Sequence, residues 1–259
     1  MTYEKVKFKK PIEMKDYREC SDFIIENIEG IIQDAIEKKE NQIVINTNLR
    51  LGLPMENINK VAGPFVEAWA FETFAKVKEN RNNKYQLVNV QAQARLAKAD
   101  IILQFKKQRK VETSITTEVD VKATAQDIEG SGKSPNITSF AVIRTGYILD
   151  PDLIFVILSL KHKVYSTRNN KTKLMDGIME VVDYKAYDIK YIASSDISYN
   201  PALGTGQLQI RDIHYVDLEY RTTWEFCQLL DKKYLASSKR SFENWFYLAN
   251  KYGWIKPND

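Results

Sequence analysis

Cysteine and histidine are scarce in this 259-residue sequence, with two of each. Cys20 and Cys227 lie far apart and form no Cys-x-x-Cys spacing, so the sequence predicts neither a disulfide framework nor a structural zinc site. Neither His162 nor His214 stands beside a serine or cysteine nucleophile, which argues against triad chemistry and histidine-based zinc catalysis. Free cysteines fit a reducing compartment, and we expect the protein in the cytoplasm.

Long apolar runs are also missing. No segment approaches the roughly 20 apolar residues of a membrane helix, and charged residues follow the lysine-rich start where a signal peptide would be apolar. Glycine (10) and proline (7) are few and 44% of the residues are hydrophobic, so the chain can bury a core. Because no repeat or linker divides it, we expect one soluble domain over residues 1–259, without membrane contact.

Net charge is only +4, yet lysine and arginine gather in short clusters, for example at 106–110 and 161–163. Most such clusters are solvated surface. A nucleic-acid binder whose carboxylates form a metal site would show the same muted total charge. The charge therefore permits DNA binding without establishing it.

Apolar spacing predicts an α/β fold with a mixed central sheet and flanking helices. One amphipathic helix is expected over 19–39, and a second is expected to begin at Pro64, directly after Gly63. A basic turn at 106–110 should separate two strands. The expected strands are 86–91, 100–105, 114–124, 153–160 and 207–215; the expected helices are 137–149, 223–235 and 241–252, with a further helix and strand within 173–192.

The candidate catalytic group lies on two neighbouring predicted strands. Residues two apart on a strand project from one face, so Glu118, Asp120 and Lys122 should point the same way, while the valines between them point into the core. Asp100 opens the preceding strand and can approach Asp120. Two converging carboxylates are the hard oxygen ligands that Mg²⁺ prefers, and such an ion can activate water and neutralise the scissile phosphate. Lys122 would orient the attacking water and stabilise the developing negative charge.

Two alternatives stay open for these residues. An acidic residue two positions before a lysine occurs six times in the sequence, so the tripeptide alone is weak evidence, and the β-branched context is what separates Asp120. Glu67 falls in the first turn of the helix expected from Pro64. It could help to arrange the metal site, but the helix dipole also favours a glutamate at that position.

The polar loop at 127–136 is a candidate DNA contact. Gly132-Lys133-Ser134 has the form of the end of a nucleotide phosphate-binding loop, but Asp127 stands where its first glycine belongs, so we expect no nucleotide cofactor. A loop of this composition could instead lie along a DNA groove, with Lys133 and Asn136 reaching phosphates and base edges. Alternatively, it is a solvated turn in which Asn136 caps the following helix.

The second polar loop, at 199–206, leads into Gln207-Leu208-Gln209. The two glutamines share one face of the predicted strand and could each read an adenine through two hydrogen bonds. They could equally be the solvent-exposed side chains of an edge strand.

The sequence resembles the HpaI-like type II restriction endonucleases and, more distantly, the blunt-cutting members of the PD-(D/E)xK nuclease superfamily. The similarity covers nearly the whole chain, and its long motifs are highly specific. It is carried by Asn46-Thr47-Asn48-Leu49, by the run from Leu53 to Lys60, by Ala99-Asp100-Ile101-Ile102-Leu103-Gln104-Phe105, by the run from Gly132 to Phe140, and by the run from Asp196 to Gln207.

The resemblance assigns roles residue by residue. Asp100 matches the first aspartate of the superfamily motif, Asp120 the second acidic residue and Lys122 the lysine; Ala99 stands where the motif's name has proline. Glu67 is similar to a helix glutamate near the metal site of blunt-cutting relatives. DNA contacts are implied in two segments, roughly 127–140 and 196–215, with a catalytic core at roughly 60–165; the candidate DNA-binding residues are Lys133, Ser134, Asn136, Thr205, Gln207 and Gln209.

The resemblance further implies a homodimer that cuts double-stranded DNA at the centre of GTTAAC, with Mg²⁺, as part of a restriction-modification system. Two-fold symmetry suits a palindrome, because identical surfaces then meet identical half-sites. Two alternatives have different signatures. A structure-selective repair or junction-resolving nuclease of the same fold would show no single sequence preference, and a non-catalytic DNA-binding protein would not need Asp100, Asp120 and Lys122 together.

Overall fold

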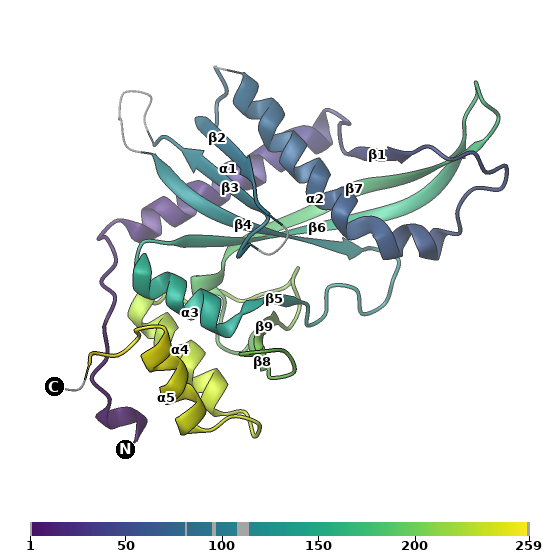
Figure 1. Ribbon diagram of the computed structural model, residues 1–259. Helices are drawn as coiled ribbons and strands as arrows, with labels where there is room; N and C mark the ends of the chain where they lie inside the picture. Colours follow the sequence, from purple (N-terminus) through teal and green to yellow (C-terminus); the bar gives the residue numbers. More distant parts are fainter. Residues whose placement is uncertain (1, 81, 95–96, 108–113, 258–259) are drawn as a thin grey trace. The chain divides into compact units, whose positions relative to one another are not determined.

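The computed structural model describes residues 2–80, 82–94, 97–107 and 114–257 (Figure 1). The chain forms two compact units. We call Cys20–Gly132 with Phe155–Tyr187 the central unit, and Met1–Glu19, Lys133–Ile154 and Asp188–Asp259 the terminal unit. Within the described ranges, no helix is long and apolar enough to span a membrane.

The central unit is built on a six-stranded sheet in the order β1-β7-β6-β4-β3-β2. β1 pairs with β7, and β3 pairs with both β2 and β4, each pair antiparallel. β4 and β6 run in the same direction in Figure 1, so the sheet is mixed and the predicted fold class is confirmed. The strands are β1 (Gln42–Ile45), β2 (Leu87–Ala92), β3 (Ile101–Phe105), β4 (Ile115–Ala125), β6 (Ile154–Arg168) and β7 (Met175–Asp188).

Two helices, α1 (Tyr17–Glu37) and α2 (Met55–Glu79), flank this sheet. The α1 helix buries Ile24, Ile28, Ile31 and Ile32. Its Phe23 ring meets Phe105 of β3 edge-on at 6.4 Å between ring centroids. The α2 helix contacts β2 and β4. Its core positions repeat every four residues and are all at most 1% exposed; they are Ile58, Ala62, Val66, Ala70 and Phe74.

The expected start of α2 at Pro64 was wrong, because the helix begins at Met55 and runs through the proline. A proline inside a helix removes one hydrogen bond to the carbonyl four residues earlier. Pro64 and Lys60, the residue that loses that bond, both lie on the exposed face of the helix. The buried face is therefore continuous across the proline, and Glu67 sits in the middle of α2 rather than in a first turn.

Other expectations needed smaller corrections. The helix expected within 173–192 is absent from these described residues: β7 fills most of the segment, followed by the short 3-10 turn η2 (Ile189–Tyr191). Residues 137–139 belong to a strand, and the strand expected to reach Tyr215 ends at Ile210. Residues 108–110 of the expected basic turn lie outside the described part of the chain.

The terminal unit combines a small sheet with helices. Its strands are β5 (Asn136–Ser139), β8 (Ile197–Asn200) and β9 (Gln207–Ile210), in the order β5-β9-β8. Its helices are η1 (Tyr3–Lys5), α3 (Phe140–Leu149), α4 (Thr223–Leu235) and α5 (Phe242–Lys251). Capping boxes begin α4 and α5, at Thr222 and Ser241. A buried ion pair between Arg144 and Asp231 (3.1 Å) joins α3 to α4.

Candidate active site

Asp100 is fixed beside β4 by the backbone. Its amide donates to the Val119 carbonyl (3.0 Å), and its Oδ2 accepts a hydrogen bond from the Val121 amide (2.7 Å). These two bonds bracket Asp120 on the neighbouring strand. The β3–β4 register, with Ile101 opposite Val119, explains why residues twenty positions apart meet here.

Asp120 and Lys122 form an ion pair along one face of β4. The lysine Nζ lies 2.8 Å from Oδ1 and 2.7 Å from Oδ2 of Asp120. Asp120 is only 4% exposed, whereas the Lys122 side chain is 24% exposed. One step earlier on the same face, Glu118 pairs with Lys98 at 2.8 Å. The alternation expected from the sequence is therefore present, with carboxylates and lysine on one face.

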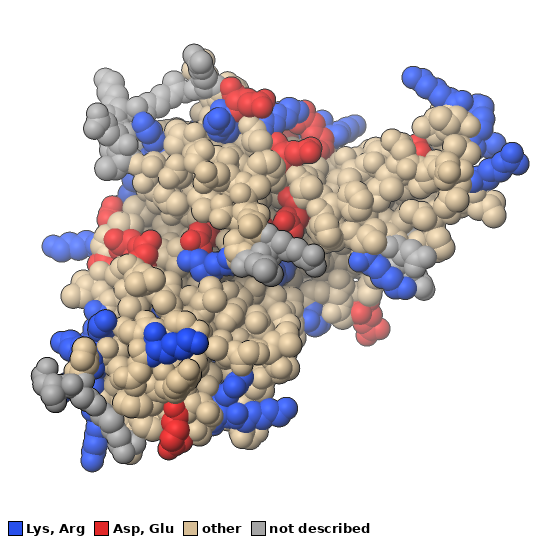
Figure 2. All heavy atoms as spheres, viewed as in Figure 1, with Lys and Arg blue, Asp and Glu red and all other residues tan. Residues whose placement is uncertain are grey.

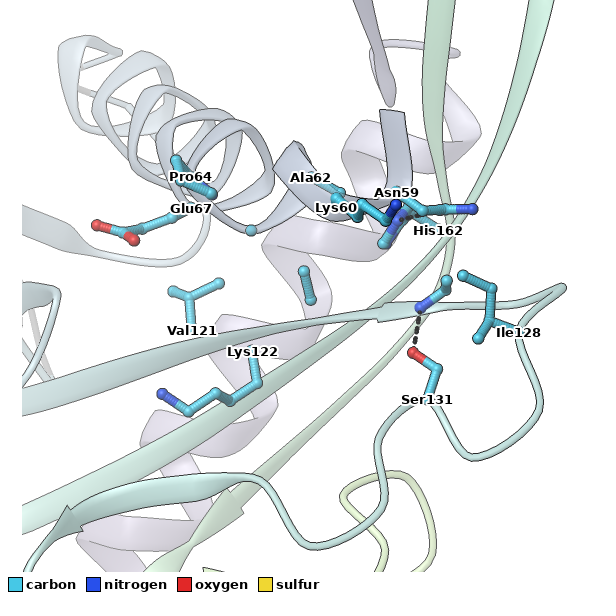
Figure 3. A pocket seen from close by; sticks show the side chains of 13 residues that line it. Asn59, Lys60, Ala62, Pro64, Glu67, Val121, Lys122, Ile128, Ser131 and His162 are labelled. Carbon is cyan, nitrogen blue, oxygen red and sulfur yellow. Dashed lines mark hydrogen bonds between the residues drawn. The ribbon is translucent and has the colours of Figure 1, made fainter. Parts of the chain in front are cut away.

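A pocket of about 680 Å³ lies between α2 and β4 (Figure 3). Asn59, Gly63 and Glu67, spaced four residues apart on α2, line one wall, and Val121 and Lys122 of β4 line the other. In Figure 3 Val121 points from β4 toward α2 and Glu67, while the Lys122 side chain lies on the other side of the β4 ribbon, and the charged ends of Glu67 and Lys122 point to the same side of the view. The sequence placed Glu67 near the catalytic strand, and the structure brings it there.

The electrostatics of the site link all four predicted catalytic residues. Burial raises the pKa of Asp120 to about 7, with Lys122 opposing the rise and the charges of Asp100 and Glu67 adding to it. Burial also raises the pKa of Glu67, as does Asp100, while Lys122 lowers it. Carboxylates that repel one another in a poorly solvated place favour a cation or a proton among them. Perturbed acids in a cleft are typical of a functional site.

Sequence reasoning missed the far end of the pocket. His162 of β6 is 2% exposed, its Nε2 lies 3.3 Å from Asn59 Oδ1, and burial lowers its pKa. Ser131 accepts a hydrogen bond from the Ala125 amide at 2.8 Å. The sequence prediction missed Asn59 because it started α2 at Pro64 instead of Met55. The apolar residues that repeat every four positions from Ile58 onward indicate the longer helix.

The predicted DNA-binding residues all fall in the terminal unit, along the sheet β5-β9-β8. Ser134 and Asn136 lie close to Gln209: the glutamine Nε2 donates to the Ser134 carbonyl at 2.9 Å, and Asn136 stands opposite Gln209 in the β5–β9 register. Gln207 stands opposite Ser139. Burial alternates along β9: Leu208 and Ile210 are buried, and Gln207 and Gln209 are partly exposed. The two glutamine side chains therefore lie on the same face of the strand, as expected.

Two of these residues also hold the local structure together. Lys133 forms an ion pair with Asp212. Thr205 Oγ1 lies 2.8 Å from Ser139 Oγ and accepts a hydrogen bond from the Ala141 amide at 3.3 Å, at the start of α3. Gly206, which follows Thr205, has φ +90° and packs so closely on Tyr199 that a Cβ would overlap the ring. Asn136 does not cap α3, because Ser139 occupies the N-cap position.

A mixed sheet with flanking helices, and with an Asp, Asp, Lys group on adjacent strands, is the arrangement of a restriction-endonuclease-like nuclease core. The chain matches the family described as Type II restriction endonuclease HpaI over residues 4–253. It is 56% identical over 256 residues to the Type II restriction enzyme HpaI of Haemophilus parainfluenzae, covering 99% of this chain and 100% of that protein. The chain therefore belongs to the HpaI family of type II restriction endonucleases and is a site-specific endonuclease that acts on double-stranded DNA.

Proposed function

We propose that the enzyme hydrolyses the central phosphodiester bond of GTTAAC in each strand of duplex DNA, with Mg²⁺, and leaves blunt ends. The observation that carries the proposal is the grouping of Asp100, Asp120 and Lys122 on and beside β4, with Glu67 of α2 close enough to raise the pKa of Asp120. The site sequence and the blunt cut rest on the resemblance, supported by 56% identity over the whole length of the relative. Membership of that family favours this function over a repair nuclease or a non-catalytic DNA-binding protein.

The donor set fits a hard divalent cation. Asp120 is nearly buried, and its Oδ2 lacks a well-oriented hydrogen bond although Lys122 Nζ is 2.7 Å away. Asp100 uses one oxygen for the Val121 amide, which leaves Oδ1 available to a cation. Among the described residues, no three His, Cys, Asp or Glu side chains already form a closed metal cage. Mg²⁺ commonly takes one or two protein carboxylates and completes its shell with water and phosphate, so two aspartates suffice.

The protein's own residues then have distinct tasks. Asp100 and Asp120 would hold the ion, which supplies charge neutralisation at the phosphate and a more acidic water. Lys122, tethered to Asp120, would orient the attacking water and stabilise the negative charge that develops on the phosphate oxygens. Glu67, on the opposite wall, would help to position the water through its carboxylate. The other residues that line the pocket, including Asn59 and Ser131, would contact the DNA strand.

Base recognition would be the task of the terminal unit. Lys133, Ser134, Asn136 and Thr205 would contact the backbone and base edges, and Gln207 and Gln209 would each read an adenine through two hydrogen bonds. The small sheet fixes the glutamines on one face at neighbouring positions. The central TA step of GTTAAC is easily unstacked, so DNA deformability would add to the discrimination. The two units would act together as one endonuclease domain.

We also propose a homodimer that works in the cytoplasm. Two identical subunits related by a two-fold axis match the symmetry of a palindromic site, and each would cut one strand. This arrangement predicts that both strands are cut at symmetry-related positions.

Single-turnover cleavage of a duplex with one GTTAAC site tests the catalytic assignment. Asp100→Asn, Asp120→Asn, Lys122→Met and Glu67→Gln should each slow the cut while leaving DNA binding measurable. The matched control is Glu118→Gln, which changes a carboxylate on the same face of β4 that is paired with Lys98. A Glu118 variant as slow as the Asp120 variant, or an Asp120 variant at the wild-type rate, would contradict the proposal.

A further inference from the structure

The hairpin formed by β6 and β7 ends in a cluster of positive charge. Its turn, residues 169–174, is flanked by Arg168 and carries Lys171 and Lys173. Arg50 belongs to the loop after β1, and the Leu49 carbonyl before it accepts a hydrogen bond from the Met175 amide at the same end of the hairpin. All four side chains are exposed. Figure 2 shows lysines and arginines gathered at the end of this projection, with a largely uncharged shaft behind them. We call Arg50, Arg168, Lys171 and Lys173 the basic tip.

The basic tip differs from the rest of the hairpin in how its charge is balanced. Nearer the sheet, Lys161 lies 3.6 Å from Asp183 and Lys163 lies 3.3 Å from Glu180, so the lysines of β6 are matched by carboxylates of β7. Across the described residues, none of the four tip cations forms an ion pair. The tip therefore presents uncompensated positive charge to solvent, which attracts a polyanion.

The turn that carries this charge is well organised. The Asn169 side-chain oxygen accepts hydrogen bonds from the amides of Lys171 (3.0 Å) and Thr172 (3.1 Å), and its Nδ2 donates to Asp176 (2.9 Å). Lys173 adopts φ +60°, a left-handed conformation that costs a lysine energy. Glycine or asparagine would adopt this backbone conformation at a lower energy cost than lysine does. The turn nevertheless has lysine here, and Lys171 and Lys173 both lie at the end of the hairpin.

The Arg50 loop is fastened to the same hairpin. Thr47 Oγ1 donates to the Met175 carbonyl at 2.9 Å, and the Met175 amide donates to the Leu49 carbonyl at 3.3 Å. Gly52 passes so close to Met175 that a Cβ there would sit 3.0 Å from the Met175 side chain. Two segments distant in sequence are therefore joined, and each contributes cations to the tip.

The reach of the hairpin can be counted along the strands. The Gln126 amide donates to the His162 carbonyl, so the end of β4 lies beside His162. Because β4 and β6 run in the same direction, Lys122 lies beside residue 158 or so, and Arg168 is about ten residues further along. At about 3.3 Å per residue, the tip is up to about 33 Å from Lys122, or about ten base pairs of B-DNA at 3.4 Å each. A six-base-pair site cut at its centre extends only three base pairs to each side.

We propose that the basic tip binds phosphates of the DNA duplex outside the recognition sequence. The inference rests on the proposed function, since it takes the pocket at Lys122 as the point of cutting. The ligand is the sugar-phosphate backbone, contacted without regard to base sequence, and the consequence is affinity that depends on the length of DNA flanking the site. The contact would also increase the salt dependence of binding, because each neutralised phosphate releases counterions.

The test compares wild-type protein with the triple variant Arg168→Gln, Lys171→Gln, Lys173→Gln, using Ca²⁺ in place of Mg²⁺ so that bound DNA stays intact. The control is Lys161→Gln with Lys163→Gln, which removes paired lysines from the same hairpin. Equilibrium binding is measured on duplexes that extend about 5 and about 15 base pairs from the centre of GTTAAC. At about 0.9 counterions per contact, the triple variant should lower the slope of log K against log salt by about 2.7 for each subunit, which is about 5.4 for the proposed homodimer. From about 50 to about 200 mM salt, the wild type should then lose more affinity for the long duplex than the variant does, by about 40-fold for one bound tip and about 2,000-fold when the tips of both subunits bind.

The wild type should also prefer the long duplex, whereas the triple variant, which keeps only Arg50 of the basic tip, should lose most of that preference. Cutting of the short duplex should be the same for both proteins. An unchanged salt slope and length preference in the triple variant would overturn the inference while leaving the endonuclease intact. If the triple variant sediments as a monomer, the basic tip contacts the other subunit of the dimer, and the inference that it binds DNA is overturned. Wild-type protein that neither binds nor cuts GTTAAC duplexes would defeat the proposed function itself, and this inference with it.

Discussion

Replacing Asp120 by asparagine should make the protein more stable at alkaline pH in metal-free buffer, while abolishing cleavage. Asp120 is 4% exposed, and burial is the main cause that raises its pKa to about 7. Asparagine has nearly the same shape and carries no charge. The substitution therefore removes the cost of ionising a buried acid and leaves the surrounding packing in place. Active sites often contain residues that disfavour the fold in this way.

The direction follows from proton linkage. An aspartate has a pKa of 3.8 in the absence of the fold. Between 3.8 and about 7 the folded protein keeps a proton that the unfolded chain has released, so stability falls as pH rises through this window. At 1.36 kcal/mol for each pH unit, the full cost above pH 7 is about 4 kcal/mol. Roughly 2 to 3 kcal/mol of it should appear between pH 5 and pH 8.

Urea denaturation in EDTA at pH 5 and pH 8 measures this difference. The free energy of unfolding of Asp120→Asn, relative to wild type, should rise by that amount between the two pH values. Glu118→Gln serves as the control, because the Glu118 side chain is 21% exposed and paired with Lys98, and it should show no comparable gain. If wild type and Asp120→Asn change in parallel from pH 5 to pH 8, the account of Asp120 as a destabilising buried acid is refuted.

Three further predictions concern the metal, the lysine and base recognition. Mg²⁺ should raise the unfolding midpoint of the wild type at pH 8, because a ligand that binds only the folded state stabilises it; calorimetry should show no such rise for Asp120→Asn, and an equal rise in both would place the ion elsewhere. Lys122→Met should lower the single-turnover cleavage rate about 10²- to 10³-fold with little change in DNA affinity, and a loss confined to affinity would make Lys122 a phosphate contact only. Gln209→Ala should weaken discrimination at one base pair by about 1 to 3 kcal/mol, measured as cleavage rates on all single-base variants of GTTAAC; Gln104→Ala, on β3, is the control, and an unchanged profile would remove Gln209 from recognition.

The catalytic strand could be predicted because its signal is local. Alternation along β4 places Asp120 and Lys122 on one face whatever the rest of the fold does, and Asp100 needed only the antiparallel pairing of two short neighbouring strands. The helices α4 and α5 were found for the same reason, since polar caps and apolar spacing mark their ends. In these segments the local preference and the tertiary structure agree.

Other features could not be found in this way because tertiary packing decided them. Pro64 is a common first residue of a helix, but here it sits on the exposed side of a longer one, and the misplaced start hid Asn59 and misassigned Glu67 to a first turn. The buried residues from Gly177 to Met179 are compatible with a helix or a strand. They form part of strand β7 because the segment pairs between β1 and β6 in the sheet. His162 joins the pocket only through the pairing of β6 with β4, which no local pattern reveals.

The most direct test of the central claim is digestion of a plasmid of known sequence by wild-type protein and by Asp120→Ala, each with and without Mg²⁺. The account predicts discrete blunt-ended fragments that map to GTTAAC, produced by the wild type only when Mg²⁺ is present and never by the variant. Full activity of Asp120→Ala would contradict the assignment of the catalytic site. Discrete cutting by the wild type at another sequence would contradict the specificity while leaving the nuclease chemistry standing.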